Sequence, residues 1–308
     1  MTVTTAQKPN DAGLVSANLI CMFSMLIWAT GLPAADYLIP LLPPEQLTCL
    51  RMTLAAGALL PIWLGLDGFA ALTRVNWPKG IAVGGLIGVG AWFLIEGQAR
   101  SGAVTTAVIS ASLPVAGIAI EMALDGRKLT LALVLGMLLS LIGGSLALDF
   151  TQGGMSLGVG ALMCFASVLV FALGSRLTVT ALPDQTPIGR TVITLIGAAV
   201  TTFTLALLQC AWGTPAPDFS GWGGKEIAAM LLFSVGSLGL SQIAWIMSVE
   251  RLGIGLSALH INAAPFYVML ILFALGAPWD WVQAGAAALV GLGVLIAQGL
   301  LPLPGMRR

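Results

Sequence analysis

The sequence predicts an all-α integral membrane protein with ten transmembrane helices, arranged as two inverted five-helix repeats. Three observations lead to this fold class. Charged residues make up only 8% of the 308 residues and hydrophobic residues 58%, with a mean hydropathy of +0.98. The apolar residues gather in long stretches, and the two halves of the chain resemble each other. So few charges cannot cover the surface of a water-soluble protein of this size.

Ten apolar stretches approach or exceed the span of about 20 residues that crosses a bilayer. We expect helices, because an open sheet leaves backbone groups unpaired in lipid and barrel strands would alternate polar with apolar residues. The first stretch is too long for a signal-peptide core and should remain as the first helix. The predicted spans are 14–38, 45–67, 78–100, 102–122, 130–148, 156–179, 186–211, 225–248, 254–275 and 281–301.

The charge distribution predicts the orientation of these spans. Lys and Arg favour cytoplasmic loops. With the N-terminus inside, ten of the 13 Lys and Arg residues fall on the cytoplasmic side, and Arg51, Arg100 and Lys225 fall outside. Both termini are then cytoplasmic, which requires an even number of spans. We therefore expect cytoplasmic tails at 1–13 and 303–308.

The two halves repeat the same features at nearly constant spacing. Arg100 and Pro114 lie 151 residues before Arg251 and Pro265. Other pairs are Arg51 with Arg190, 139 apart, and Gly136 and Gly144 with Gly285 and Gly293, each 149 apart. Repeats of 14–150 and 151–302 would hold five spans each, so the second must enter from the opposite side. Inverted repeats of this kind are common in secondary transporters; chance similarity between apolar segments is the alternative.

Ionisable groups deep in a span are costly and therefore candidates for function. His260, the only histidine, lies in the ninth predicted span with Asn262 two positions later. The two could hydrogen-bond a substrate, or His260 could take up a proton. The alternative is a histidine that bonds a carbonyl of a neighbouring helix.

Three charges are predicted at the outer mouth. Glu96 and Arg100 are four residues apart and should face each other on a helix. We expect a local ion pair, with Arg51 as a third member. Arg51 could instead attract a carboxylate at the outer rim.

Pro114 and Pro265 occupy matching places in the fourth and ninth spans. A proline inside a helix frees a carbonyl one turn earlier, here those of Ser110 and Ile261. These positions could form hinges or gates beside a ligand, with Ser110 in contact with it, or could be static kinks.

Tryptophans within the spans are candidates for lining a solute path. They are Trp28, Trp92 and Trp245, and the polar neighbours Gln242 and Tyr267 would suit an aromatic or amphipathic solute. Core or lipid-facing tryptophans are equally consistent with the sequence. Glycine rows at Gly80, Gly84 and Gly88, and at Gly136 and Gly144 with Ser140, predict close helix packing, within the chain or in a dimer.

Enzymatic motifs do not fit. Residues 154–158 match the Gly-x-Ser-x-Gly pattern, but no strand is predicted before them, and Ser156 is better interpreted as a helix N-cap. The sequence holds no zinc or phosphate-binding motif, and the four cysteines lack metal-ligand spacing. We expect no enzyme activity, no metal, no cofactor and no nucleic acid partner.

The order of motifs resembles a known family. Residues Ile27 to Gly31 (IWATG), the Pro44, Gln46 and Arg51 series, and the two segments that run from a basic loop to a proline carry this resemblance. It covers nearly the whole chain. The sequence resembles the drug/metabolite transporter (DMT) superfamily, in its EamA-type ten-helix branch, and within it the YddG-type aromatic amino acid exporters. The chain departs from the family in ending its fourth span with Asp125-Gly126 in place of a Gly-Glu pair.

The resemblance implies two inverted repeats around a central cavity in a bacterial inner membrane. It implies export of amino acids and related metabolites by alternating access. The protein could act as a monomer, and its partners would be its small-molecule substrate and the bilayer. Drugs, nucleotide sugars or lipid-linked intermediates are alternative substrates. A lipid-modifying membrane enzyme is the alternative class. The predicted cavity residues are Trp28, Trp92, Ser110, Gln242, Trp245, His260, Asn262 and Tyr267.

Overall fold

The computed structural model describes residues 11–146, 158–274, 276, 278–279 and 281–301. All regular elements in this part of the chain are helices. Six of them are long and apolar enough to cross a membrane: Gly13–Ala35, Pro44–Asp67, Trp77–Ser101, Val159–Ala181, Pro187–Ala211 and Gly224–Leu252. The remaining predicted stretches also fall on helices, which are shorter or interrupted, so ten crossings remain a prediction.

The described part of the first half contains six helices. They are α1 (Asp11–Leu38), α2 (Pro44–Asp67), the short α3 (Ala71–Arg74), α4 (Trp77–Ser110), α5 (Leu113–Asp125) and α6 (Leu131–Leu146). The described part of the second half contains α7 (Val159–Ala181), α8 (Pro187–Ala211), α9 (Gly224–Leu231), the π-helix η2 (Leu232–Leu240), α10 (Ser241–Leu252), α11 (Ile254–Ala258), the 3-10 helix η3 (Leu259–Ala263), α12 (Ala264–Ala274) and α13 (Trp281–Ala297).

The predicted break between the spans 78–100 and 102–122 is wrong, because α4 continues through it to Ser110. The Ser101 hydroxyl donates to the Gly97 carbonyl at 2.7 Å, and no proline interrupts this segment. In lipid an unpaired backbone is costly, so a helix persists until a residue cannot donate. The break falls at residues 111–112, just before Pro114.

The prediction that Pro114 and Pro265 lie inside a continuous helix is also wrong. Each is the second residue of a new helix, α5 or α12, where proline costs no hydrogen bond. The Ile261 carbonyl is not left free, since it accepts the Ala264 N–H at the end of η3. The structure therefore has two restarts in place of two kinks.

The eighth predicted span is a compound of α9, η2 and α10. Hydroxyl groups bond back along the helix, from Ser234 to the Met230 carbonyl at 2.6 Å and from Ser237 to the Phe233 carbonyl at 2.9 Å. Such bonds compete with the regular backbone ladder, and a π-bulge often marks a functional segment of a helix. The wide turn places small residues, among them Gly239, against α2.

The glycine rows pack against other helices of the same chain, as predicted. A Cβ on Gly84 would overlap the Thr194 carbonyl oxygen of α8 and lie 2.8 Å from the Gly197 Cα. A Cβ on Gly136 would lie 2.7 Å from the Ala297 backbone nitrogen of α13. Only glycine allows such close backbone approach. These rows therefore build the α4–α8 and α6–α13 contacts within the chain.

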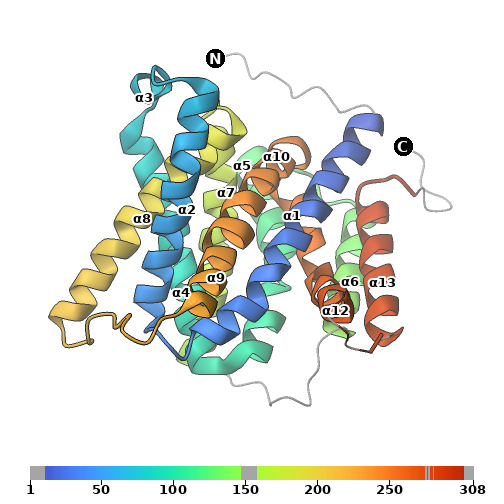
Figure 1. Ribbon diagram of the computed structural model, residues 1–308. Helices are drawn as coiled ribbons and strands as arrows, with labels where there is room; N and C mark the ends of the chain where they lie inside the picture. The colour runs from blue at the N-terminus through green and yellow to red at the C-terminus, as the bar shows by residue number, and fades with distance from the viewer. Residues whose placement is uncertain (1–10, 147–157, 275, 277, 280, 302–308) are drawn as a thin grey trace.

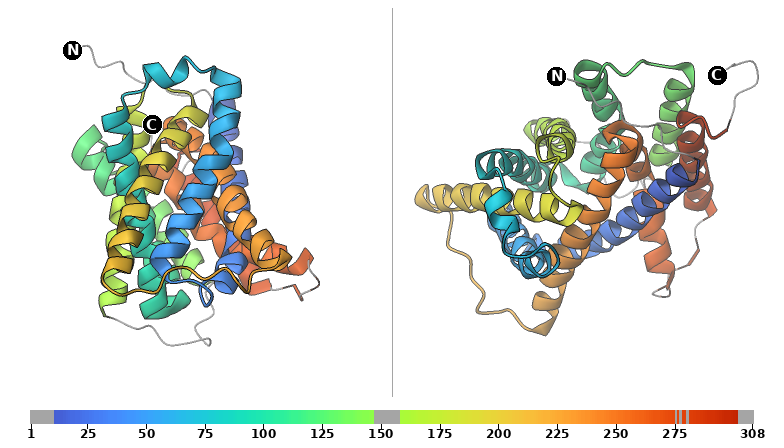
Figure 2. Two further views of the ribbon diagram at one scale, coloured as in Figure 1. Left: turned by 60° about the vertical axis from the view of Figure 1, so that its left-hand side comes forward. Right: turned by 90° about the horizontal axis from the view of Figure 1, so that it is seen from above.

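Figure 1 shows that the first turn of α1 and the last turn of α13 lie at the same end of the bundle. Seen from above in Figure 2, α6 and α13 stand together on one side, and α2, α4 and α8 gather on the other. Between them α1 packs along η2 and α10.

Candidate functional site

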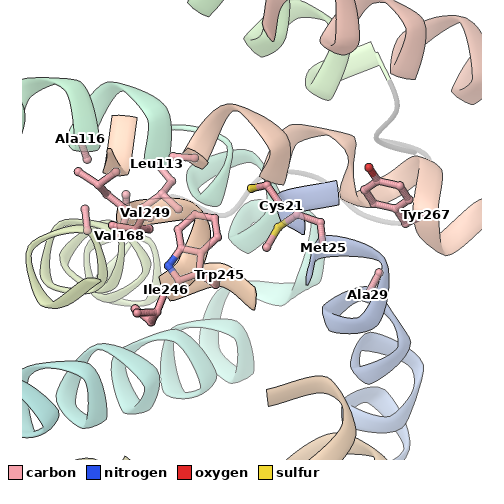
Figure 3. Packing of buried hydrophobic residues seen from close by; sticks show 13 residues of the cluster. Cys21, Met25, Ala29, Leu113, Ala116, Val168, Trp245, Ile246, Val249 and Tyr267 are labelled. Atoms are coloured by element: carbon pink, nitrogen blue, oxygen red, sulfur yellow. The ribbon is translucent and has the colours of Figure 1, made fainter. Parts of the chain in front are cut away.

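Two of the predicted lining residues, Trp245 and Tyr267, belong to one buried apolar cluster. The cluster also contains Cys21, Met25 and Leu113. Figure 3 shows Trp245 beside Leu113 and Val249, and Tyr267 on the far side of Cys21 and Met25. Its members come from α1, α5, α7, α10, α11 and α12, so both halves of the chain contribute.

Trp245 is fixed by α7. Its ring is 2% exposed, and its Nε1–H donates to the Ser175 hydroxyl at 3.1 Å. The Phe171 ring stacks against it with centroids 6.0 Å apart. The indole therefore presents a rigid apolar wall, because its one polar group is already bonded.

Hydrogen bonds to carbonyl oxygens hold α1 against α10 and α11. The Ser24 hydroxyl donates to the Ser241 carbonyl at 2.7 Å, and the Cys21 thiol donates to the Ser257 carbonyl at 3.5 Å. Since hydroxyl and thiol groups are uncharged, they can make such bonds in the membrane interior without the cost of burying a charge.

Three buried polar side-chain atoms on α10, α11 and η3 have no hydrogen-bond partner. They are Gln242 Nε2 on α10, Ser257 Oγ on α11 and His260 Nδ1 on η3. Ser257 and His260 are three residues apart, which places them on one helix face. A buried polar atom without a partner is costly, so each of these atoms is a candidate contact for a solute or water. Sequence reasoning missed Ser257; its spacing from His260 was the available signal.

Asn262 has a hydrogen-bond partner on α6, so its contact with a substrate beside His260 remains a prediction. Asn262 Nδ2 donates to the Ser140 hydroxyl of α6 at 3.0 Å, and that hydroxyl donates to the Leu259 carbonyl at 3.2 Å. Residues two apart on a 3-10 helix point in different directions. Asn262 therefore anchors η3 to α6, with its Oδ1 left without a partner.

The other predicted cavity residues lie elsewhere on α1 and α4. Trp28 and Ser110 are half-buried. Trp92 stacks on Phe93 with centroids 5.3 Å apart, and its buried Nε1 has no partner. These three residues are not brought to the Gln242, Ser257 and His260 group by any hydrogen bond or ring contact in the described part of the chain. Their place in a cavity remains a prediction.

At the predicted outer mouth, the ion pair between Glu96 and Arg100 is present, with Arg100 Nε 2.7 Å from Glu96 Oε1. Arg51 does not join it, which corrects that prediction. Arg51 is buried, donates to the Phe233 carbonyl at 3.1 Å and lies 4.0 Å above the Phe233 ring. Its planar guanidinium stacks on the aromatic face and ties α2 to η2.

Metal chemistry and the serine motif remain without structural support. No group of three or more His, Cys, Asp or Glu side chains gathers in the part of the chain that the structure describes. Of the Gly-x-Ser-x-Gly motif, residues 154–157 lie outside the described residues.

Comparisons with known proteins agree with a transporter. Residues 15–148 match the EamA-like transporter family. The uncharacterized transporter YyaM of Bacillus subtilis (strain 168) is 28% identical over 292 residues, which cover 92% of this chain and 93% of that protein. One protein crystal structure is similar in fold, with a TM-score of 0.75 and 24% sequence identity. The match covers 95% of this chain and 99% of that chain.

Residues 15–148 are thus similar to the EamA-like transporter family, and nearly the whole chain is similar to a protein named as a transporter. The matches do not identify the YddG-type branch, a substrate or a direction of transport.

Proposed function

We propose that this protein is a secondary transporter that exports amino acids, aromatic ones included, and related small metabolites across the bacterial inner membrane. Transport would proceed by alternating access of two inverted five-helix repeats. The observation that carries this proposal is a set of paired contacts between the halves. Each contact from the first half to the second has a counterpart from the second half to the first.

The first recurring contact is a hydroxyl-to-carbonyl bond. Ser24 of α1 donates to the Ser241 carbonyl at 2.7 Å, and Ser167 of α7 donates to the Gly90 carbonyl of α4 at 2.7 Å. The acceptors Gly90 and Ser241 are 151 residues apart, the spacing of the two prolines. The first helix of each half thus bonds the third span of the other half in the same way.

The second recurring contact is a close approach at a glycine. A Cβ on Gly88 would lie 3.3 Å from the Ala198 Cβ, and one on Gly239 would lie 3.4 Å from the Leu59 Cδ1. Gly88 and Gly239 are 151 residues apart, and Leu59 and Ala198 are 139 apart. Both spacings match those found in the sequence, which supports a pseudo-two-fold relation.

The helix restarts also recur. α5 begins at Leu113 and α12 begins at Ala264, again 151 residues apart. Interrupted helices in matching positions of two inverted halves are typical of the substrate region of secondary transporters. We assign the gating role to these restarts, with Pro114 and Pro265 at their starts.

The candidate site favours a solute with an apolar ring and hydrogen-bonding groups. Trp245 and Tyr267 supply aromatic surface, and Gln242, Ser257 and His260 supply uncharged polar atoms without partners. An aromatic amino acid has a ring for the first kind of contact. Its carboxylate can accept from Gln242 Nε2–H, and its ammonium group can donate to Ser257 Oγ.

The test is flux in liposomes. The purified protein should carry labelled phenylalanine and other amino acids, and His260→Ala and Gln242→Ala should each reduce flux about tenfold, the effect of losing one or two hydrogen bonds. Asn262→Ala reports on anchoring of η3, so it should also lower thermal stability. Comparison with and without a pH gradient tests proton uptake by His260.

A matched control separates a site effect from a general one. Thr204 is exposed on α8, away from the candidate site, and its hydroxyl donates to the Val200 carbonyl of the same helix at 2.9 Å. Thr204→Ala should therefore leave flux unchanged. Absence of flux for every amino acid tested, by protein that remains folded, would contradict the proposed substrate class.

A further inference from the structure

A buried carboxylate joins the two halves at the end of the bundle where α1 begins and α13 finishes. Glu121, on the last turns of α5, is 5% exposed. Its Oε1 accepts the backbone N–H of Gly255 in α11 at 3.0 Å, and its Oε2 pairs with the Arg127 guanidinium. The bond to Gly255 therefore connects the first half of the chain to the second.

Two glycines make room for this carboxylate. A Cβ on Gly253 would lie 3.2 Å from the Glu121 Cδ, and a Cβ on Gly255 would lie 2.9 Å from Oε2. Gly253 also has a φ of +80°, which glycine tolerates and other residues rarely adopt. The turn between α10 and α11 is therefore shaped to hold the carboxylate.

Within the described residues, this arrangement is found at one end of the bundle. The spacing of 151 residues places Leu272 at the position in the second half that corresponds to Glu121. The opposite end is joined by an exposed hydrogen bond from the Tyr37 hydroxyl to Glu226, where water competes for both groups. The two ends are therefore joined by different chemistry.

We propose that Glu121 is a proton-binding site whose protonation opens this end of the protein. The proposal rests on the alternating-access function proposed above. As a carboxylate, Glu121 accepts a charge-assisted bond from Gly255 and attracts Arg127. When an oxygen binds a proton from solution, that charge disappears, both interactions weaken, and α5 can separate from α11.

The surroundings limit which groups can titrate. Arg127 from the segment after α5 pairs with Glu121, and Arg176 from α7 pairs with Asp125 on α5 itself. α11 contains no titratable side chain, and η3, which also contacts α5, contributes His260. The guanidinium groups stay charged, so Glu121, Asp125 and His260 are the groups that an experiment must separate.

Labelling of Cys21 gives a readout that needs no transported solute. The Cys21 thiol donates to the Ser257 carbonyl, two residues after Gly255, so release of α11 should expose it. The full chain with Cys49→Ala, Cys164→Ala and Cys210→Ala keeps this thiol alone. The measurement is the rate of reaction with a water-soluble maleimide in detergent between about pH 8 and pH 5.

The result is the ratio of the rate in Glu121→Gln to the rate with Glu121 intact, which cancels the thiol's own pH dependence. We expect a ratio of at least about ten at pH 8, because glutamine mimics the protonated carboxyl, and a fall of the ratio toward one as the pH is lowered. Glu121→Asp, one methylene shorter, should also label fast at pH 8, since its carboxylate cannot reach Gly255. It replaces the glutamine variant if that variant does not fold.

Glu250→Gln is the matched control, since it removes a carboxylate whose pair with Arg190 lies within the second half. Its ratio should stay near one at each pH. A ratio for Glu121→Gln that stays near one would overturn the proposal. A ratio that does not change with pH would also overturn it and would point to His260 or Asp125 as the titrating group. If the labelling ratio depends on pH but the protein carries no amino acid, the result would instead count against the proposed substrate.

Discussion

At the residue scale, this chain satisfies most of its buried polar groups with uncharged bonds to carbonyl oxygens. The hydroxyls of Ser24, Ser140 and Ser167 each bond a carbonyl of another helix. Such bonds hold helices together where lipid provides no hydrophobic driving force between them. Gln242, Ser257 and His260 are among the exceptions in the described part of the chain, because each has a buried polar atom without a partner.

Asp125 gives a prediction at this scale. Its hydrogen bond from Arg176 holds the pKa of the Asp125 carboxyl below its ordinary value. The pair therefore stabilises the fold above the unfolded pKa of about 4, and this contribution is lost as the pH falls through the lower folded value. We expect Asp125→Asn to lower the melting temperature at pH 7 and to remove this loss below pH ~4.

Thermal unfolding in detergent across this pH range checks the prediction. Arg176→Gln should produce the same pH profile as Asp125→Asn, and combining the two should add little. An Asp125→Asn protein that still loses the same stability on acidification would assign that loss to another carboxylate.

At the element scale, the helices are positioned by glycines that let backbones touch. α4 meets α8 at Gly84, and α6 meets α13 at Gly136, in both cases against backbone atoms. Interrupted elements differ from these contacts: η2 and η3 replace regular α-helical turns, and a break at residues 111–112 precedes α5. A side chain placed in a glycine contact must separate two helices, because backbone atoms cannot rotate away.

We therefore expect Gly84→Leu to destabilise the protein by more than the ~1–3 kcal/mol of ordinary overpacking, since its Cβ would overlap the Thr194 carbonyl oxygen. Gly57→Leu on α2 is the matched control, because no atom lies within 4 Å of its added Cβ. The melting temperatures of the two variants in detergent give the comparison. Equal melting temperatures would contradict the α4–α8 contact.

At the scale of the whole molecule, contacts that recur on exchanging the halves favour a two-fold arrangement. An even number of crossings would place both ends of the chain on one side of the membrane, and α1 begins where α13 finishes in Figure 1. The positive charge bias predicts that this side is cytoplasmic.

Tags at the two termini test this topology. In intact cells, a protease added outside should cut neither tag, and in inverted membrane vesicles it should cut both. A tag after Asp218, in the exposed segment between α8 and α9, should show the reverse pattern as the internal control. Opposite accessibility of the two termini would exclude the paired five-helix arrangement.

Hydropathy and span length were enough to assign the class of protein and most element positions, because a bilayer constrains both in every crossing segment. α1, α2, α8 and α13 begin within three residues of their predicted starts for this reason. The constant spacing of Pro114 from Pro265 likewise located the two helix restarts, although not their geometry.

Contacts with distant parts of the chain determine whether similar segments continue a helix or end it. Arg100-Ser101-Gly102 continues as helix in α4, whereas Arg251-Leu252-Gly253 ends α10. In the second half the Glu121 carboxylate accepts the N–H of Gly255, which lets the backbone turn at Gly253. In the same way, the Ser140 hydroxyl of α6 accepts a hydrogen bond from Asn262 and anchors η3. Local spacing cannot show such outcomes, because the partner that decides them lies more than a hundred residues away.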